Sequence, residues 1–320
     1  MNKTLASISL VIPLYNKANH ILHTLESVLN QSEPVLEIII VNDGSTDRGE
    51  KIVQAAIENQ PQHSQVRLIN QKNGGVSRAR NTGIAAARGT HVAFMDADDY
   101  WLPGATAEFY KLIQMFPHAR AQATNYIKVE GEHTIQPKIR FAQQMEGPCL
   151  LDHYFSICAR GDLPFFSSSI CAEKSLLQEV GGFPVGEAMG EDQDVWSKIA
   201  LQTDIAYSPK QLAAYVLDSD NRACKRLTTT EECPFSKRLH RAVQQGDIPQ
   251  PLSAPVLTYT ATHLLYLAAD LIRSGELEPA RTLLNDSRCA LLPLKRSRLL
   301  LHMRVKQLTQ WLPPSLQPHC

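Results

Sequence analysis

The chain has 320 residues, with 32 basic and 32 acidic side chains and a formal net charge of zero. This balance excludes the broad basic surface of a nucleic-acid-binding protein, so we expect no nucleic-acid partner. A hydrophobic content of 43% allows a sizeable core, and the length predicts one large domain with an extension, or two domains.

Cysteine usage and hydropathy indicate a reducing, aqueous setting. Seven scattered cysteines without a Cys-X-X-Cys pair favour neither a disulfide framework nor a zinc site. The apolar run near the start is interrupted by Pro13 and is too short for a signal-peptide core. No run approaches the ~18 apolar residues needed to span a membrane. We therefore expect a cytoplasmic protein, with peripheral contact at the inner membrane face as an open alternative.

Predicted strands and helices alternate through the first part of the chain. Continuous apolar runs predict strands, and apolar residues at helical spacing predict the helices between them. The predicted strands are 8–14, 36–41, 66–69 and 92–98, and the predicted helices are 21–29, 46–57 and 76–87. This alternation is typical of an α/β fold with a Rossmann-like, mostly parallel sheet flanked by helices.

The later sequence does not continue this regular alternation of strands and helices. A predicted strand at 121–129 is followed by a variable connection rich in turn residues. Beyond it, Pro249, Pro251 and Pro255 introduce a Leu-rich region in which residues 263–281 predict a helical hairpin. We predict a domain at 1–225, with halves at 1–115 and 116–225, and a C-terminal helical extension at 226–320.

Polar loops follow all four predicted strands of the first half. In parallel sheets, ligands bind outside the carboxyl ends of the strands. Each loop alone also fits ordinary turn chemistry, but four together favour one shared pocket. The loops are Pro13-Leu14-Tyr15-Asn16, Asn42-Asp43-Gly44-Ser45, Lys72-Asn73-Gly74-Gly75 and Asp96-Ala97-Asp98.

The fourth loop carries a cluster of carboxylates. If 92–98 is extended, Asp96 and Asp98 share one face, roughly 6 to 7 Å apart, and Asp99 points away. Two such oxygen donors suit Mg²⁺ or Mn²⁺, which binds through one or two carboxylates plus substrate phosphates. The alternative is a strand followed by a helix that Asp99 caps, with Pro103 in its first turn.

Together these motifs resemble family-2 glycosyltransferases, the inverting, nucleotide-sugar-dependent transferases with the A-type glycosyltransferase fold. A weaker second block, ending in Gly190-Glu191-Asp192-Gln193-Asp194-Val195-Trp196, resembles the acceptor half of that family. The stronger motifs lie within residues 7–115 and are Val11–Asn16, Val41–Asp47, Asn73–Gly83 and Asp96–Asp99.

The resemblance implies that the strand-end loops hold a UDP-sugar. Asp43 would accept a hydrogen bond from uracil N3–H, which favours uracil over cytosine because cytosine N3 cannot donate. Glycines in the third loop let the backbone approach the ligand, and the amino end of the next helix attracts phosphate. Arg80 alternatively pairs with a strand-end Asp. The predicted donor-binding residues are Pro13, Tyr15, Asn16, Asp43, Asn73, Gly75, Ser77, Arg80, Asp96 and Ala97.

The resemblance also implies a divalent cofactor, Mn²⁺ or Mg²⁺, that bridges the two phosphates. Asp98 is the preferred ligand, with Asp96 and Asp218 as further candidates. Members of the family often carry a histidine near the end of a later strand. Here Tyr215–Arg222 contains none, and Asp218 stands where the histidine would fall.

An inverting displacement needs a base that removes the proton of the acceptor hydroxyl. By resemblance Asp192 is that base, Glu191 and Trp196 bind the acceptor, and Asp194 is structural. Acids at a helix amino end also serve as simple caps. Phe165–Ile170 fits either an acceptor-lining segment or an edge strand. The implied activity is that of a hexosyltransferase acting on a hydroxyl of a glycan or lipid-linked saccharide.

Two other functions stay open on the sequence alone. A metal-dependent phosphohydrolase would use Asp-X-Asp with the first Asp as nucleophile, but would place it on the first strand. A non-catalytic nucleotide-sugar- or glycan-binding protein would be expected to lack the base, whereas Glu191-Asp192 is present.

The C-terminal segment alternates basic and apolar residues without an acid between them. Such a helix lies on an anionic membrane, or packs with its charged face in solvent. Its basic residues are Arg288, Lys295, Arg296, Arg298, Arg304 and Lys306, and its apolar residues are Leu299, Leu300, Leu301, Val305, Leu308 and Trp311.

Overall fold

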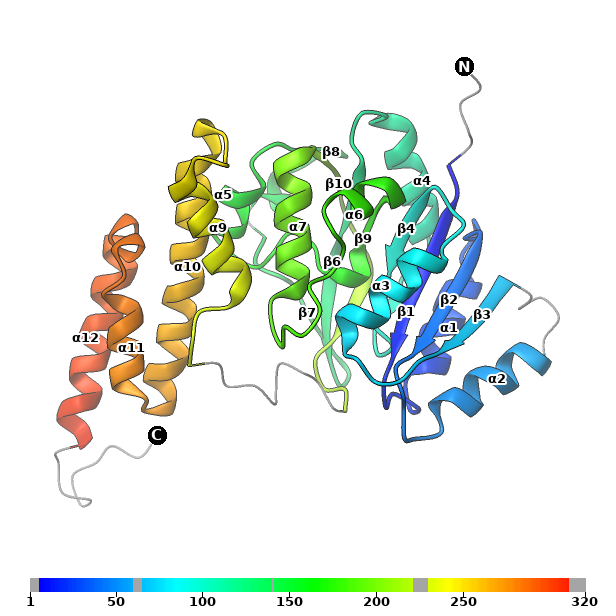
Figure 1. Cartoon of the computed structure of the whole chain (residues 1–320), viewed down its shortest axis with the longest axis horizontal. Helices are drawn as coiled ribbons and strands as arrows, with labels where there is room; N and C mark the ends of the chain where they lie inside the picture. The colour runs from blue at the N-terminus through cyan, green and yellow to red at the C-terminus, as the bar shows by residue number, and fades with distance from the viewer. Residues whose placement is uncertain (1–5, 60–64, 140, 221–229, 311–320) are drawn as a thin grey trace. The chain divides into compact units, whose positions relative to one another are not determined.

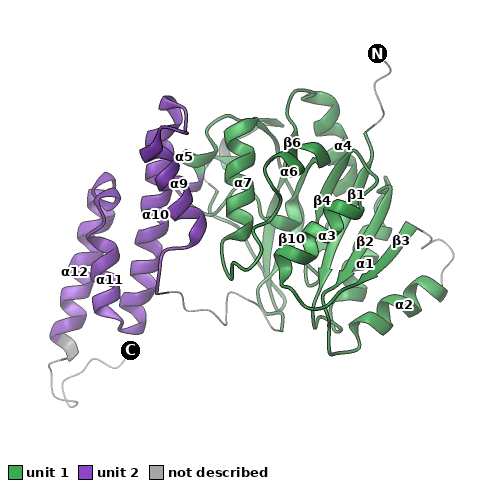
Figure 2. Cartoon of the chain, viewed as in Figure 1, with its two compact units in different colours: residues 1–157, 161–226 green, residues 158–160, 227–320 purple. Residues whose placement is uncertain are grey.

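A computed structural model describes residues 6–59, 65–139, 141–220 and 230–310 of the chain (Figure 1). The chain divides into two compact units (Figure 2). The first contains residues 1–157 and 161–226, and the second contains 158–160 and 227–320. The sequence predicts a boundary at 225, and the main division falls between residues 226 and 227.

The first unit is built on one sheet with the strand order β3-β2-β1-β4-β9-β6-β10-β5. Its first four strands pair in parallel and are joined by helices, so the predicted element order is confirmed. The strands are β1 (Ile8–Leu14), β2 (Glu37–Asn42), β3 (Val66–Asn70) and β4 (His91–Phe94), and the helices are α1 (Ile21–Leu29), α2 (Gly49–Asn59) and α3 (Val76–Ala86).

Helices cover both faces of this parallel half. Ile8, Leu10 and Ile12 share a core with the apolar sides of α1 and α2. On the other face α3 packs so closely that a Cβ added at Gly83 would lie 2.3 Å from a methyl carbon of Val11. Because β1 is covered on both faces, its sequence reads as a continuous apolar run.

The second half of the sheet is mixed. β9 (Ile170–Glu173) lies between β4 and β6 (Ala121–Glu130) and is antiparallel to both, whereas β10 (Ile205–Val216) runs parallel to β6. Of the two alternatives for 165–170, the edge strand is wrong, because residues 167–169 form a 3-10 helix and only Ile170 lies in a strand, the interior strand β9. The remaining elements are β5 (Tyr100–Trp101), β7 (His133–Ile135), β8 (Cys149–Leu151), α4 (Ala105–Met115), α5 (Tyr154–Cys158), α6 (Lys174–Glu179) and α7 (Glu191–Gln202).

The second unit is helical and has its own core. The predicted hairpin is confirmed, since α10 ends at Ser274, Gly275 adopts φ 94°, and α11 follows. Its helices are α9 (Pro234–Gln245), α10 (Gln250–Ser274), α11 (Leu277–Leu284) and α12 (Pro293–Gln310). No helix in the described ranges is both long enough and apolar enough to cross a bilayer.

Candidate active site

The first three strand-end loops are tied to one another by their own side chains. Asn16, at φ 52°, donates its backbone N–H to Ser45 Oγ (3.1 Å), and its Oδ1 accepts from Thr46 N (2.8 Å). Loop one is thereby fixed to loop two. The side chain of Tyr15 beside it is exposed to solvent.

The buried carboxylate of Asp43 joins loop two to loop three. It accepts from Gln71 Nε2 (2.7 Å) and from the backbone N–H groups of Gly74 (2.9 Å) and Gly75 (2.8 Å). Asn73 Nδ2 in turn donates to the Asp43 carbonyl oxygen (2.9 Å). The predicted uracil contact therefore also shapes the loop before α3. The sequence reasoning missed Gln71.

The carboxylate cluster does not have the predicted geometry. β4 ends at Phe94, and Asp96–Asp99 form a turn in which Asp99 N–H donates to the Asp96 carbonyl oxygen (3.0 Å). The expectation that strand alternation puts Asp96 and Asp98 on one face is therefore wrong. Asp99 is buried, accepting from Ser168 Oγ (2.6 Å) and Val216 N (3.0 Å), and does not cap a helix.

Arg80 connects the fourth strand-end loop to the Glu-Asp motif. Its side chain is 3% exposed and donates to Asp96 Oδ1 (2.7 Å) and Glu191 Oε1 (3.0 Å), with its guanidinium carbon 5.0 Å from the centre of the Phe183 ring. Burial alone would lower the pKa of Arg80, but the two carboxylates raise it. The guanidinium therefore stays charged. The pairing with a strand-end Asp, which the sequence left as an alternative, is present.

Asp192 lies beside this bridge in the first turn of α7. Gln193 N–H donates to its Oδ1 (2.7 Å). Burial and the charge of Glu191 raise the pKa of Asp192, Arg80 opposes them, and the net result is a pKa of about 7. A carboxylate that titrates near neutrality suits general-base chemistry. Asp194, predicted to be structural, pairs with Lys198 one turn later (2.7 Å).

Asp98 faces a lysine that the sequence reasoning did not single out. Lys17 Nζ lies 2.7 Å from Asp98 Oδ2 and 3.3 Å from Ser219 Oγ, and it also donates to the Asp220 carbonyl oxygen. The position of Lys17 directly after Tyr15-Asn16 in the first loop could have identified it as a candidate site residue from the sequence. A pocket of about 910 Å³ adjoins it, lined in part by Asn16, Arg48 and Lys51.

Several residues predicted to bind donor or acceptor instead lie inside the fold. Trp196 is buried against Phe94 and Phe183, so it offers no surface to a saccharide, contrary to the prediction. The Ser77 hydroxyl is shielded from solvent. The Ala97 carbonyl accepts from Thr24 Oγ1 (3.0 Å), inside the fold.

Asp218 does not complete a metal site. Its Oδ2 accepts from Gly131 N (2.8 Å), because the β6–β10 pairing carries the chain past Val216 toward the β6–β7 turn. Over the described residues, no three His, Cys, Asp or Glu side chains form a group that could hold a metal. Binding of a cation at the predicted ligand Asp98 would require Lys17 to leave that carboxylate. Arg222, from the same predicted stretch, lies outside the described residues.

The comparisons with known proteins agree with this architecture. Residues 9–172, just over half of the chain, match the model of Glycosyl transferase family 2. The uncharacterized glycosyltransferase YibD of Escherichia coli is 48% identical over 103 residues, 32% of this chain and 29% of YibD. EpsJ of Bacillus subtilis, also named an uncharacterized glycosyltransferase, is 44% identical over 93 residues, 29% of this chain and 26% of EpsJ.

Solved structures extend the similarity across the fold. The crystal structure of S. aureus TarS 1-349 in complex with UDP-GlcNAc has a TM-score of 0.66 and 17% identity, covering 95% of this chain and 91% of that one. This likeness indicates the A-type glycosyltransferase fold. The chain spans less than a third of the length of YibD and EpsJ. On the evidence of the matched family model, the chain belongs to glycosyl transferase family 2.

Proposed function

We propose that the protein is an inverting glycosyltransferase that moves a sugar from a UDP-sugar to a hydroxyl of a glycan or lipid-linked saccharide. The observation that carries the proposal is the Arg80 bridge between Asp96 and Glu191. It supports the proposal because it joins the turn after β4 to the acid pair at the start of α7.

The donor assignment rests on the first three loops. Tyr15 has an exposed ring for stacking, and Asp43 keeps oxygen lone pairs that can accept from uracil N3–H beside the Gly74 and Gly75 N–H groups. TarS, which has this fold, has been crystallised with UDP-GlcNAc and with UDP. UDP-sugars are therefore the donors that we propose.

In the proposed reaction Asp192 takes the proton of the acceptor hydroxyl while that oxygen attacks the anomeric carbon opposite the leaving UDP, so the configuration inverts. Glu191, held by Arg80, orients the acceptor. Positioned general bases typically contribute ~10² to 10⁴-fold in rate. A divalent cation, Mn²⁺ or Mg²⁺, held by Asp98 together with phosphate oxygens, would neutralise charge on the diphosphate.

A phosphohydrolase is less well supported. The first aspartate of the motif, its presumed nucleophile, is Asp96, whose Oδ1 is held by Arg80. Pairing with a buried guanidinium lowers the nucleophilicity of a carboxylate. A protein that only binds nucleotide-sugars would have no use for a carboxylate whose pKa is raised toward neutrality beside Glu191.

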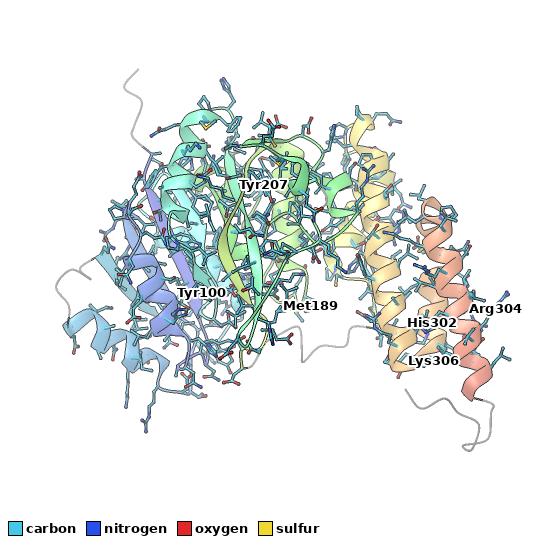
Figure 3. The ribbon with its side chains drawn as sticks, turned by 180° about the vertical axis from the view of Figure 1, so that it is seen from behind. Tyr100, Met189, Tyr207, His302, Arg304 and Lys306 are labelled. Carbon is cyan, nitrogen blue, oxygen red and sulfur yellow. The ribbon has the colours of Figure 1, made fainter. Side chains whose placement is uncertain are left out.

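We further propose that α12 contacts an anionic membrane surface. Leu294, Leu301 and Leu308 recur every seven residues along it, and Leu294 (87%) and Leu308 (70%) are strongly exposed. The helix carries five basic and no acidic residues, and in Figure 3 the side chain of Arg304 extends away from it. An exposed leucine stripe flanked by basic residues suits an anionic lipid surface. It suits a second copy of the chain less well, because the basic residues of the two helices would repel each other. Arg288 does not contribute, because it is buried between Glu232 and Asp286, and Trp311 lies outside the described residues.

A panel of UDP-, CDP- and GDP-sugars, with and without Mn²⁺, tests the function by calorimetry. We expect UDP-sugars to bind most tightly, and NMR of the product with an accepted acceptor to report an inverted anomeric centre. Equal binding of the three nucleotides, a retained anomeric configuration, or turnover of phosphate esters alone would contradict the proposal.

A further inference from the structure

We propose that Lys17 is a tethered cation that occupies the metal-binding side of Asp98, so that a divalent metal binds there only by displacing it. The proposal rests on the proposed function, because that function gives Asp98 a metal to hold. It assigns Lys17 a role in setting how strongly the free enzyme binds metal.

The contacts of Lys17 account for all three protons of its ammonium group. Nζ donates to Asp98 Oδ2 at 2.7 Å, to Ser219 Oγ at 3.3 Å and to the Asp220 carbonyl oxygen. The side chains of Lys17 and Asp98 are only 11% and 14% exposed. This is a largely desolvated ion pair in which the ammonium has three acceptors, and not a surface lysine near an acid by chance.

The peptide group that follows Lys17 is fixed by three hydrogen bonds. Its carbonyl oxygen accepts from the N–H groups of His20 and Ile21 at 3.0 Å each, which ties it to the start of α1. The next N–H, of Ala18, donates to Asp47 Oδ2 (2.8 Å). Because the backbone is already ordered, holding the side chain against Asp98 costs only the rotamer entropy of that side chain.

The charges around Asp98 explain why a cation is needed there. Asp96, Asp98 and Asp99 crowd three carboxyl groups into one turn, and Arg80 pairs with Asp96. Lys17 is therefore the counter-charge of Asp98. Since the described residues offer no three-ligand set, a metal meets this ammonium as a direct competitor for one carboxylate.

The test is a titration of Mn²⁺ into the full chain without nucleotide. Binding is measured by calorimetry or by the electron paramagnetic resonance signal of free Mn²⁺. Lys17→Met and Lys17→Gln remove the ammonium, and we expect either to bind Mn²⁺ about tenfold more tightly than the native protein. Lys51→Met, which changes an exposed lysine of the adjoining pocket, is the matched control and should leave Mn²⁺ affinity unchanged.

A second background separates competition at Asp98 from a general change in charge. In Asp98→Asn, the Lys17→Met substitution should give no gain in Mn²⁺ affinity, because the contested carboxylate is gone. A gain of equal size there, a gain in Lys51→Met, or native-like or weaker Mn²⁺ binding in both folded Lys17 variants would overturn the proposal. Circular dichroism establishes that each variant is folded. No nucleotide or turnover is involved, so failure here leaves UDP-sugar binding and inversion to be judged by their own assays.

Discussion

Replacing Arg80 by Met should uncouple the two halves of the proposed site. The substitution keeps an apolar stem beside Phe183 but leaves Asp96 and Glu191 without their shared cation. Removing one partner of a buried ion pair costs about 3 to 5 kcal/mol. Asp96 is 31% exposed and regains water, so we expect the lower end, about 3 kcal/mol. For a unit of this size each kcal/mol lowers Tm by about 2 to 4 °C, which predicts a fall of roughly 6 to 12 °C.

The same variant should change the pH dependence of the reaction. Arg80 opposes the rise in the pKa of Asp192, so without it that pKa moves above about 7. A base must be deprotonated to act. The acidic limb of kcat/KM, which in the native enzyme should fall off below about pH 7, therefore moves to higher pH.

The control for Arg80 is Arg120, which also bridges two carboxylates, those of Glu173 and Glu179, but at the surface. Arg120→Met should cost less than about 1 kcal/mol and leave the pH profile unchanged. The measurements are calorimetric melting and kcat/KM from pH 5.5 to 9. If Arg80→Met and Arg120→Met melt alike and share the native acidic limb, the bridge does not have the importance assigned to it.

Three further predictions concern the base, the uracil contact and α12. Asp192→Asn should abolish turnover while UDP-sugar affinity stays within a few fold. Because the pKa of Asp192 is raised, the native protein loses stability as pH rises from about 4 through about 7. The free energy of unfolding of this variant should therefore exceed that of the native protein at pH 8 by about 1 to 2 kcal/mol, after allowance for partial solvent screening. Equal urea midpoints at pH 8, or near-normal turnover, would refute it. Asp43→Ala should weaken UDP and UMP binding equally in calorimetry, because both carry uracil; a loss confined to UDP would point to the phosphates instead. Leu301→Glu with Leu308→Glu should reduce sedimentation with phosphatidylglycerol vesicles, whereas Tyr266→Glu, at an exposed site on α10, should not; a change in oligomeric state without a change in vesicle binding would favour a second copy as the partner.

The local pattern of the sequence determined the elements of the first half. Strand β1 was predicted at its observed bounds, and α1 likewise, because burial on one face or both leaves a periodicity that nearby residues carry by themselves. The motifs that resemble the family also lie within such short stretches, so they could be found without the fold.

Pairings between distant residues were decided only by the tertiary structure. Lys17 meets Asp98 across 81 positions, and Arg80 meets Glu191 across 111. No local periodicity encodes these distances, because they follow from the order of strands in the sheet and from where each turn ends. Trp196 shows that the sequence pattern also could not distinguish a core residue from a ligand-binding one. It stands in the same helix as Glu191 and Asp192, yet an aromatic residue at helical spacing has the same local pattern whether it faces a ligand or the core. Only the packing of α7 on β4 placed it in the core.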